Sequence, residues 1–366
     1  MPPLTLTYSL ADQNFIQTKS VGIFNVSTQL LENLVRHSRF ARLSVLTNST
    51  LNSKLRLPPE VAIYNHNEAI RSRLGRFFWD QWGVYEAAKN SGNRWLFLSK
   101  GFSSFLRPPA SKLAVYIYDA IHDFYRINYP NVMPWFESKY FIRCLKATFK
   151  YADIIFTDSD IAKDELERLA NNLEIDPPLI ITAGIGFVRP KQITIDKRNS
   201  LLLLTSVWPH KITKQAVSFI ERWQKQSGFS GGVELVGSLP AGLHLPRLPG
   251  WRHHPRLSEK KYRQFLAEAR VLLFFSTYEG FGMPPVEAMI TGTCPVFSDL
   301  PVTCEVMGKT GYSFSNDSYE SFAQSMSKAL SVSETQIQLW AEELLQRHNW
   351  GKVVEKIVNG LAQSDN

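Results

Sequence analysis

The sequence predicts an α/β protein made of two domains, and three observations support this prediction. At 366 residues the chain is longer than one ordinary hydrophobic core accommodates. Its composition, 44% hydrophobic and 20% charged, is typical of a globular protein. Short apolar runs such as 201–205 and 271–275 are each followed by turn residues and a helical pattern. That order of elements is typical of a parallel sheet covered by helices.

The sequence also indicates the cellular compartment in which the protein is expected to function. No apolar stretch approaches the ~20 residues that a membrane-spanning helix needs. The N-terminus lacks a basic region followed by an apolar one, so no secretory signal is expected. Cys144, Cys294 and Cys304 are scattered and odd in number, which argues against a disulfide framework or a zinc site. We therefore expect a cytoplasmic protein in a reducing compartment.

The net charge of +8 is unevenly distributed along the chain. Residues 1–150 contain 19 Lys and Arg against 9 Asp and Glu, whereas the remainder contains 22 against 24. A basic first half indicates an anionic partner there, either a membrane surface or an anionic acceptor, unless those charges form an ordinary solvated surface. No nucleic-acid-binding motif accompanies the charge, so no nucleic-acid partner is expected.

The first half of the chain alternates helical and strand patterns. A turn that contains Gly22 precedes an apolar-periodic helix over 27–37. The strands expected after it are 43–47, 95–99, 112–118 and 152–157, and the helices are 137–150 and 160–169.

Residues 67–90 interleave Arg71, Arg73 and Arg76 with phenylalanine and tryptophan. This pattern fits a helix that contacts a membrane interface, and it also fits a core helix with a solvated basic edge.

The Pro- and Gly-rich passage 175–199 marks the expected boundary between the domains. The strands expected beyond it are 201–205, 233–237, 271–275 and 294–297, and the helices include 260–269 and 350–361.

The stretch 276–292 has the residues with the clearest chemistry. It follows the strand 271–275, contains Glu279 between glycine-bearing turns, and leads into a helix expected to begin near Pro285 with Glu287 in its first turn. A strand, a glycine-bearing loop and a helix N-terminus together offer free N–H groups and the positive end of the helix dipole. Such an arrangement binds anions.

Residues 278–289, Tyr-Glu-Gly-Phe-Gly-Met-Pro-Pro-Val-Glu-Ala-Met, closely resemble the signature of retaining, nucleotide-sugar-dependent glycosyltransferases of the GT-B fold, family 4 (glycosyl transferases group 1). The resemblance covers the second domain and is patchy over the first. It implies two Rossmann-like domains with a cleft between them. Residues 1–190 would form the acceptor-side domain, residues 191–345 the nucleotide-sugar-binding domain, and residues 346–366 a helix that crosses back to the first domain.

The resemblance also implies roles for individual residues. Glu279 would hold hydroxyls of the donor sugar and orient its anomeric carbon, and Glu287 would bind the ribose hydroxyls. Lys211 would grip the diphosphate, with His210 in the place of the family's arginine and Lys214 as a compensating cation. The other donor contacts implied by the resemblance are Gly22, Leu257, Gly280, Phe281, Gly282 and Met283.

A motif after the strand 112–118 resembles the family's strand-end His-Asp motif in two registers, one that selects Asp119 and one that selects His122 with Asp123. Either register places polar groups at the carboxyl end of a parallel strand, where open α/β sheets bind ligands. Asp119 and His122 are therefore candidate catalytic residues. A histidine that only satisfies a loop carbonyl is the alternative.

The resemblance implies transfer of a sugar, with retention of configuration, from a GDP- or UDP-sugar to a glycan or lipid-linked acceptor. The setting would be the synthesis of cell-surface polysaccharide or glycolipid, with peripheral contact at the inner face of the membrane. Lys211 and the helix dipole supply fixed positive charge for the leaving group, so neither a metal nor another cofactor is expected to be required.

Two other functions remain open at this point. One is a non-catalytic nucleotide-sugar-binding subunit, which His210 favours. The other is a metal-dependent transferase of the GT-A fold in which Asp158 and Asp160 form an Asp-x-Asp metal site. Capping of the next helix by Ser159 or Asp160 explains the same residues and is preferred.

Overall fold

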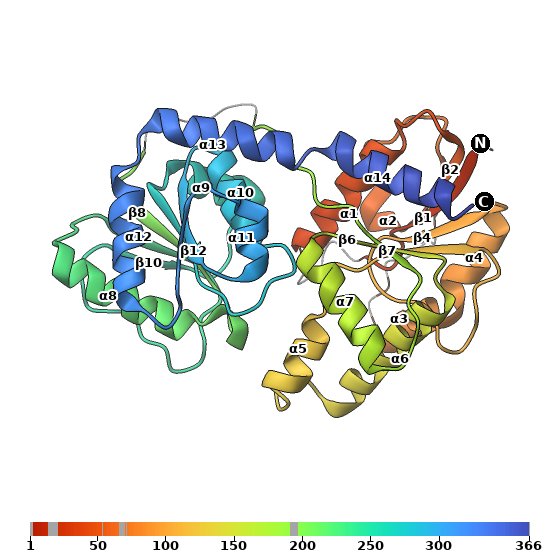
Figure 1. Ribbon diagram of the computed structural model, residues 1–366, viewed down its shortest axis with the longest axis horizontal. Helices are drawn as coiled ribbons and strands as arrows, with labels where there is room; N and C mark the ends of the chain where they lie inside the picture. Colours follow the sequence, from red (N-terminus) through yellow and green to blue (C-terminus); the bar gives the residue numbers. More distant parts are fainter. Residues whose placement is uncertain are drawn as a thin grey trace. The chain divides into compact units, whose positions relative to one another are not determined.

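The computed structural model describes residues 3–13, 21–52, 54–65, 70, 72–190 and 197–365 (Figure 1). The chain divides into two compact units: unit 1 comprises Met1–Gly186 and His348–Asn366, and unit 2 comprises Phe187–Arg347. Each unit is a parallel sheet covered by helices, so the predicted α/β class with two Rossmann-like domains is confirmed.

Unit 1 contains a parallel sheet with the strand order β3-β2-β1-β4-β5-β6-β7. Within the described residues its strands are β1 (Leu4–Ser9), β2 (Phe40–Thr47), β3 (Ala62–Asn65), β4 (Trp95–Leu98), β5 (Lys112–Tyr116), β6 (Ile154–Thr157) and β7 (Leu179–Thr182). The chain leaves β1 toward β2 and β3, then continues on the other side of β1 with β4. The strand order therefore reverses between β1 and β4, which is a topological switch point.

The helices described in unit 1 are α1 (Val21–Leu34), α2 (Ser49–Asn52), α3 (Arg73–Phe78), the π-helical turn η1 (Trp79–Gly83), α4 (Val84–Ser91), α5 (Ile121–Asn128), α6 (Trp135–Tyr151), α7 (Asp160–Asn172) and α14 (Trp350–Gln363). Helix α1 begins well before the predicted residue 27. The reason is that Phe24 is buried and extends the apolar stripe of Leu30 and Leu34 toward the N-terminus. Gly22 therefore lies in the first turn of α1 and not in a turn before the helix.

Unit 2 contains a parallel sheet with the strand order β10-β9-β8-β11-β12-β13. Its described strands are β8 (Ser200–Thr205), β9 (Gly232–Gly237), β10 (Trp251–His254), β11 (Val271–Phe274), β12 (Cys294–Ser298) and β13 (Tyr312–Phe314). The order reverses between β8 and β11. In open α/β sheets, ligands bind outside the carboxyl ends of the strands that flank such a reversal.

The helices described in unit 2 are the 3-10 turn η2 (Pro209–Lys211), α8 (Thr213–Ser227), α9 (Glu259–Glu268), α10 (Met283–Ile290), α11 (Pro301–Met307), α12 (Tyr319–Ser331) and α13 (Glu334–Arg347). Across both units, no described helix combines the length and the apolar character needed to cross a membrane.

Burial of the central strands explains why they were visible in the sequence. The first three leucines of β8, at 201–203, and the side chains of β11 are almost fully buried, as expected for strands with helices on both faces of the sheet. β1 is also buried, but it alternates leucine with threonine. Its Thr7 is accommodated because its Oγ1 lies 2.5 Å from Ser91 Oγ and accepts from Asn93 Nδ2 at 3.1 Å.

Helix α14 is packed on unit 1 although it is the last element of the chain (Figure 1). Trp350, at its first position, is 5% exposed and donates from Nε1 to Gln29 Oε1 of α1 at 3.1 Å. One helical turn and a half later, Lys356 Nζ donates to the carbonyl of Thr182 at the end of β7, at 2.9 Å. The C-terminal helix thus joins α1 to the edge of the sheet.

We expect Trp350→Ala to lower the free energy of unfolding of unit 1 by about 3–5 kcal/mol, because it removes a buried indole and leaves a cavity. Trp135→Ala is the matched control, since Trp135 is 70% exposed and its removal should change stability by less than about 0.5 kcal/mol. Urea unfolding followed by circular dichroism measures both. Equal effects of the two substitutions would show that α14 is not anchored through Trp350.

Candidate functional site

The structure brings Lys211 and Glu279 together in unit 2. Lys211 ends η2, in the loop after β8, and Glu279 lies in the loop after β11. Lys211 Nζ forms an ion pair with Glu279 Oε1 and lies 4.7 Å from the centroid of the Phe274 ring. The two loops leave the carboxyl ends of the neighbouring strands at which the sheet order reverses. The ion pair therefore sits at the switch point of the sheet, where a ligand is expected.

Backbone hydrogen bonds hold these two loops in fixed register. The carbonyl of His210 accepts from the N–H of Thr277 at 2.7 Å and from Ser276 Oγ at 3.3 Å. Asn316 Nδ2 donates to the carbonyl of Ser276 at 2.8 Å. These hydrogen bonds restrain the main chain of both loops. The backbone atoms that carry the side chains of Lys211 and Glu279 are therefore held in fixed positions.

His210 is buried and offers no positive charge at neutral pH. Burial, and secondarily the charge of Lys211, lowers the pKa of its imidazole to about 4. His210 therefore contributes its backbone to the loop, and Lys211 is the cation of this turn.

Helix α10 begins directly after the glycine-bearing loop. Gly282 precedes the helix with φ 78° and ψ 55°, a left-handed conformation, and a Cβ there would lie 3.0 Å from Thr303 Cγ2. The helix starts at Met283 and not near Pro285, because the first-turn N–H groups have no intrahelical partner and prolines there lose nothing. Glu287 is consequently the fifth helical residue and lies beyond the first turn, in contrast to the prediction.

The two glutamates of the signature face different partners. Glu287 is half-buried beside α9, where Tyr262 donates its hydroxyl hydrogen to Glu287 Oε2 at 3.1 Å. Burial raises the pKa of Glu287, and the hydrogen bond from Tyr262 lowers it in part. Tyr262 was missed in the sequence, since it lies on a helix that no motif marked and only the fold brings it to Glu287.

Apart from Gly22, which lies in α1 of unit 1, the remaining residues of the predicted donor site fall around the same edge of unit 2. Leu257 is half-buried in the loop between β10 and α9. Gly280 and Phe281 belong to the loop before α10, and the buried Phe281 ring stacks on Phe187 with centroids 6.0 Å apart.

In unit 1 the structure separates the two residues proposed for the strand-end motif. Asp119 closely follows β5, and its Oδ1 accepts from the N–H of Ile121 at the start of α5 at 3.1 Å. His122 lies within α5, where its ring stacks on Phe141 of α6 with centroids 3.5 Å apart. Burial lowers the pKa of His122 to about 4, so its ring is neutral near pH 7. Of these two residues, Asp119 is the one that lies just after the end of strand β5, whereas His122 lies in the following helix.

A charged cluster that the sequence did not reveal lies at the carboxyl edge of the unit 1 sheet. Arg76 of α3 forms ion pairs with Asp12, after β1, and with Asp80 of η1, both at 2.8 Å. Burial raises the pKa of Asp80 to about 6, against the opposing effect of Arg76. Lys100 follows β4, and burial lowers its pKa. These groups flank the switch point between β1 and β4.

The Asp-x-Asp segment is a helix cap. Ser159 precedes α7, and its Oγ accepts from the N–H of Ala162 at 3.0 Å, which confirms the capping interpretation. Within the described residues, no group of three or more His, Cys, Asp or Glu side chains is arranged to hold a metal ion. The alternative of a GT-A enzyme is wrong for this chain, because the fold consists of two parallel sheets in separate units.

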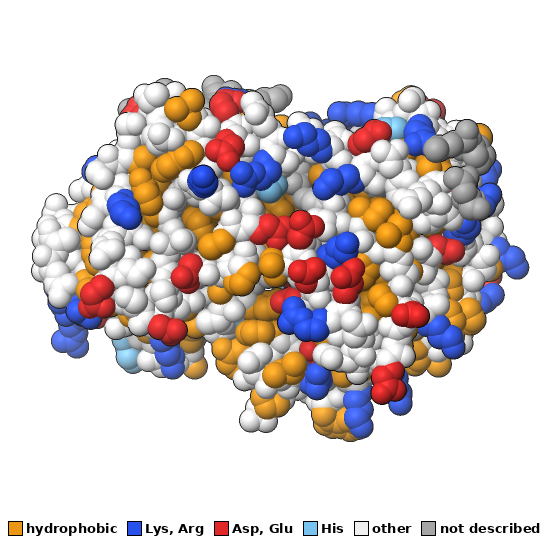
Figure 2. All heavy atoms as spheres, viewed as in Figure 1, with side chains coloured by type: hydrophobic (Ala, Val, Ile, Leu, Met, Phe, Trp, Pro, Cys, Tyr) orange, Lys and Arg blue, Asp and Glu red, His pale blue; other side chains and the backbone are white. Residues whose placement is uncertain are grey.

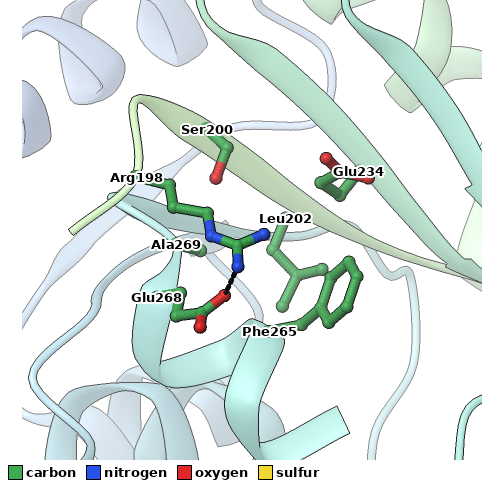
Figure 3. A pocket seen from close by; sticks show the side chains of 7 residues that line it. All are labelled: Arg198, Ser200, Leu202, Glu234, Phe265, Glu268 and Ala269. Carbon is green, nitrogen blue, oxygen red and sulfur yellow. Dashed lines mark ion pairs between the residues drawn. The ribbon is translucent and has the colours of Figure 1, made fainter. Parts of the chain in front are cut away.

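A small hollow in unit 2 lies away from the candidate site. It is lined by Arg198, Ser200, Leu202, Glu234, Phe265, Glu268 and Ala269 (Figure 3). An ion pair of 2.8 Å between Arg198 and Glu268 closes one side. Ser200 begins β8 whereas Lys211 follows its end, so the hollow lies toward the opposite edge of the sheet from Lys211 and Glu279.

The buried imidazole of His122 should make the stability of unit 1 depend on pH. Its pKa is 6.5 when unfolded and about 4 when folded, so the unfolded state binds more protons between these values and stability falls as the pH drops through that window. His122→Phe keeps an aromatic ring on Phe141 and removes the proton site. Between about pH 7 and about pH 4.5 the variant should lose roughly 2–3 kcal/mol less unfolding free energy than the wild type.

Urea unfolding at the two pH values measures this difference, with His244→Phe, at an exposed position, as the control. The same pH dependence in wild type and His122→Phe would contradict the assignment of a buried neutral imidazole.

Comparison with known proteins is consistent with this site. Residues 250–342, which include β11, the glycine-bearing loop and α10, match the family Glycosyl transferases group 1. The chain is similar to the O-antigen chain mannosyltransferase RfbU of Salmonella typhimurium, with 25% identity over 253 residues that cover 67% of this chain and 69% of that protein.

Solved structures share the architecture of the whole chain. Sucrose-phosphate synthase from Thermosynechococcus elongatus has a TM-score of 0.69 at 12% identity, with 98% of each chain covered. HepE of Anabaena, solved in complex with UDP and glucose, has a TM-score of 0.67 at 14% identity, covering 98% of this chain and 100% of that one. The chain therefore has the GT-B fold, and its residues 250–342 match the model of the family Glycosyl transferases group 1.

Proposed function

We propose that this glycosyltransferase moves a hexose from a nucleotide-diphosphate sugar to a glycan or lipid-linked acceptor, with retention of configuration. The similarity to a mannosyltransferase makes GDP-mannose the first donor to test. The likeness to HepE, which was solved with UDP and glucose, makes UDP-glucose the second. Retention is supported by the resemblance of residues 278–289 to the signature of retaining enzymes.

The observation that carries the proposal is the Lys211–Glu279 ion pair at the switch point of unit 2, beside the N-terminus of α10. Breaking the sugar–diphosphate bond leaves negative charge on the phosphate. The ammonium of Lys211 and the N–H groups at the start of α10, from Gly282 and Met283, are fixed positive groups that stabilise such a charge.

The ion pair has a second consequence for donor binding. Without a donor, Lys211 and Glu279 neutralise each other, which lowers the cost of holding two partly buried charges. When a diphosphate approaches, Lys211 exchanges the carboxylate for phosphate oxygens. Glu279 is then released to accept hydrogen bonds from hydroxyls of the donor sugar and to orient the anomeric carbon. Binding of the phosphate and positioning of the sugar are thereby coupled.

Glu287 is the residue we assign to the ribose. A carboxylate accepts hydrogen bonds from two neighbouring hydroxyl groups, and Tyr262 occupies only Oε2. Leu257, in the loop before α9, is assigned to the edge of the nucleotide base, and Gly280 and Phe281 to the wall of the donor site. His210 and Gly22 supply backbone in this assignment.

We place the acceptor at the carboxyl edge of the unit 1 sheet, with Asp119 as its polar contact and His122 behind it on α5. All three cysteines are free thiols, which fits a reducing compartment, and we place the enzyme in the cytoplasm with peripheral contact at the inner face of the membrane. Synthesis of cell-surface polysaccharide or glycolipid is the setting that fits a lipid-linked or glycan acceptor, and no metal or other cofactor is required by these assignments.

We expect Glu279→Gln and Lys211→Ala each to lower kcat by about 10²–10³, because each removes a charged group that acts on the breaking bond. Release of nucleoside diphosphate from GDP-mannose and UDP-glucose, with thermal melting as the folding control, measures the effect. The exposed pair Glu221 and Lys225, 2.6 Å apart on α8, provides matched controls as Glu221→Gln and Lys225→Ala. Turnover near the wild-type rate in Glu279→Gln and Lys211→Ala would remove both residues from catalysis.

The same assay separates the proposal from the second candidate, a non-catalytic nucleotide-sugar-binding subunit. The neutral, buried His210 favours that candidate, since it removes one cation from the phosphate-binding turn. Donor-dependent thermal stabilisation without any release of nucleoside diphosphate would establish the binding protein instead.

We expect Tyr262→Phe to shift donor binding toward higher pH. The hydrogen bond from Tyr262 lowers the pKa of Glu287, so its loss raises that pKa further and protonates the carboxylate at a higher pH. Affinity for GDP or UDP, measured by calorimetry across mildly acidic to neutral pH, should therefore decline earlier on acidification than in the wild type. Tyr319→Phe, which removes a hydroxyl bonded to Gln226, is the control. If the affinity of Tyr262→Phe declined over the same acidic pH range as that of the wild type, nucleotide recognition by Glu287 would be contradicted.

A further inference from the structure

Large apolar side chains are exposed together on one part of unit 1. Ile127 at the end of α5 is 61% exposed, and Trp135 and Phe136 at the start of α6 are 70% and 53% exposed. Figure 2 shows hydrophobic and basic side chains next to one another over α5 and the start of α6, at the lower end of the view. Exposed tryptophan and phenylalanine at neighbouring positions are unfavourable in water and mark an interaction surface.

The exposed face of α6 continues from these aromatic residues as a row of cations. Residues 135, 139, 143, 146 and 150 are spaced by four, four, three and four, so they lie on one face of the helix, and all of them are exposed. The opposite face, with Cys144, Leu145 and Phe149, is buried in unit 1. We define the α6 surface as Trp135, Phe136, Lys139, Arg143, Lys146 and Lys150.

Among the residues that the structure describes, the cations of this surface have no carboxylate partner. Within the described part of the chain, the ion pairs of unit 1 use other residues, and no carboxylate pairs with Lys139, Arg143, Lys146 or Lys150. Lys139 Nζ instead lies 4.7 Å from the centroid of the Trp135 ring, a cation–π contact that keeps the indole beside a positive charge.

The segment that the sequence marked for membrane contact is less suited to it. Phe77 packs against Trp82, Phe105 and Tyr140 with ring centroids 5.9–6.5 Å apart, so these aromatic residues stabilise the fold. Arg76 is held by two carboxylates. Phe78 is exposed on α3. The continuous row of cations that have no carboxylate partner among the described residues, however, lies on α6.

We propose that unit 1 docks on an anionic lipid bilayer through the α6 surface. In this arrangement α6 lies along the membrane, Trp135 and Phe136 enter the boundary between headgroups and acyl chains, and the four cations contact lipid phosphates. The side chains form a row along one helix and not a pocket, which suits a flat and laterally uniform partner. Aromatic residues beside a basic helical face are the composition that binds such interfaces.

Flotation of the full chain with vesicles tests the proposal. The wild type should float with equimolar phosphatidylcholine and phosphatidylglycerol, should float poorly with phosphatidylcholine alone, and should be released by added salt. Replacing Lys139, Arg143 and Lys146 by glutamine should weaken binding to the anionic vesicles about a hundredfold, since each cation near the surface contributes about fivefold. Trp135→Ser with Phe136→Ser should weaken binding while its salt dependence remains.

Arg36→Gln, Lys89→Gln and Arg168→Gln together form the matched control, because they remove the same charge from exposed positions elsewhere in unit 1. The proposal is overturned when the wild type does not float with anionic vesicles, or when the α6 variant and the control float alike. Self-association that depends on Trp135 and Phe136, without flotation, would assign the surface to a protein partner instead. Donor binding, followed by thermal shift, should be equal in all variants, so failure here leaves the donor site unaffected.

Discussion

The ion pair between Lys211 and Glu279 is the constraint on which the candidate site depends. Both side chains are mostly buried, with 23% and 13% of their surfaces exposed. Either charge alone would lack compensation in a partly dry environment, so each requires the other until a ligand replaces it. The contact exists only because β8 and β11 are neighbours in the sheet although about 70 residues separate them. The strand order of unit 2 therefore decides the chemistry of the loops that follow these two strands.

Unit 1 contains two kinds of charged groups, one paired and buried and the other exposed. At the carboxyl edge of its sheet, Arg76 is enclosed by Asp12 and Asp80, and burial changes the proton affinity of Asp80. On the outer face of α6, by contrast, four cations have no carboxylate partner among the described residues. Paired and buried charges organise a site, whereas unpaired and exposed charges remain available to an anionic surface. Four of the 19 basic residues in the first half of the chain thus lie on one helical face.

His210 stands where the resemblance of the sequence implies an arginine. An arginine in this turn would provide a second cation, but the imidazole is buried and neutral, and the carbonyl of His210 accepts a hydrogen bond from the N–H of Thr277. Lys211 is left to carry the positive charge of the turn, assisted by the N-terminus of α10. The fold is therefore retained, while the turn that we propose for phosphate binding has a neutral side chain at position 210.

The sequence alone determined the fold class, most strands, and the glycine-bearing loop with its two glutamates. It did so because buried parallel strands form continuous apolar runs and because Gly282 is required by a left-handed backbone. It did not identify β1, whose buried Thr7 forms hydrogen bonds with distant side chains, or the early start of α1. Only the tertiary structure brought Tyr262 to Glu287, Arg76 to Asp12, and Lys211 to Glu279. These contacts join residues far apart in the chain, and no local pattern of the sequence records which strands become neighbours.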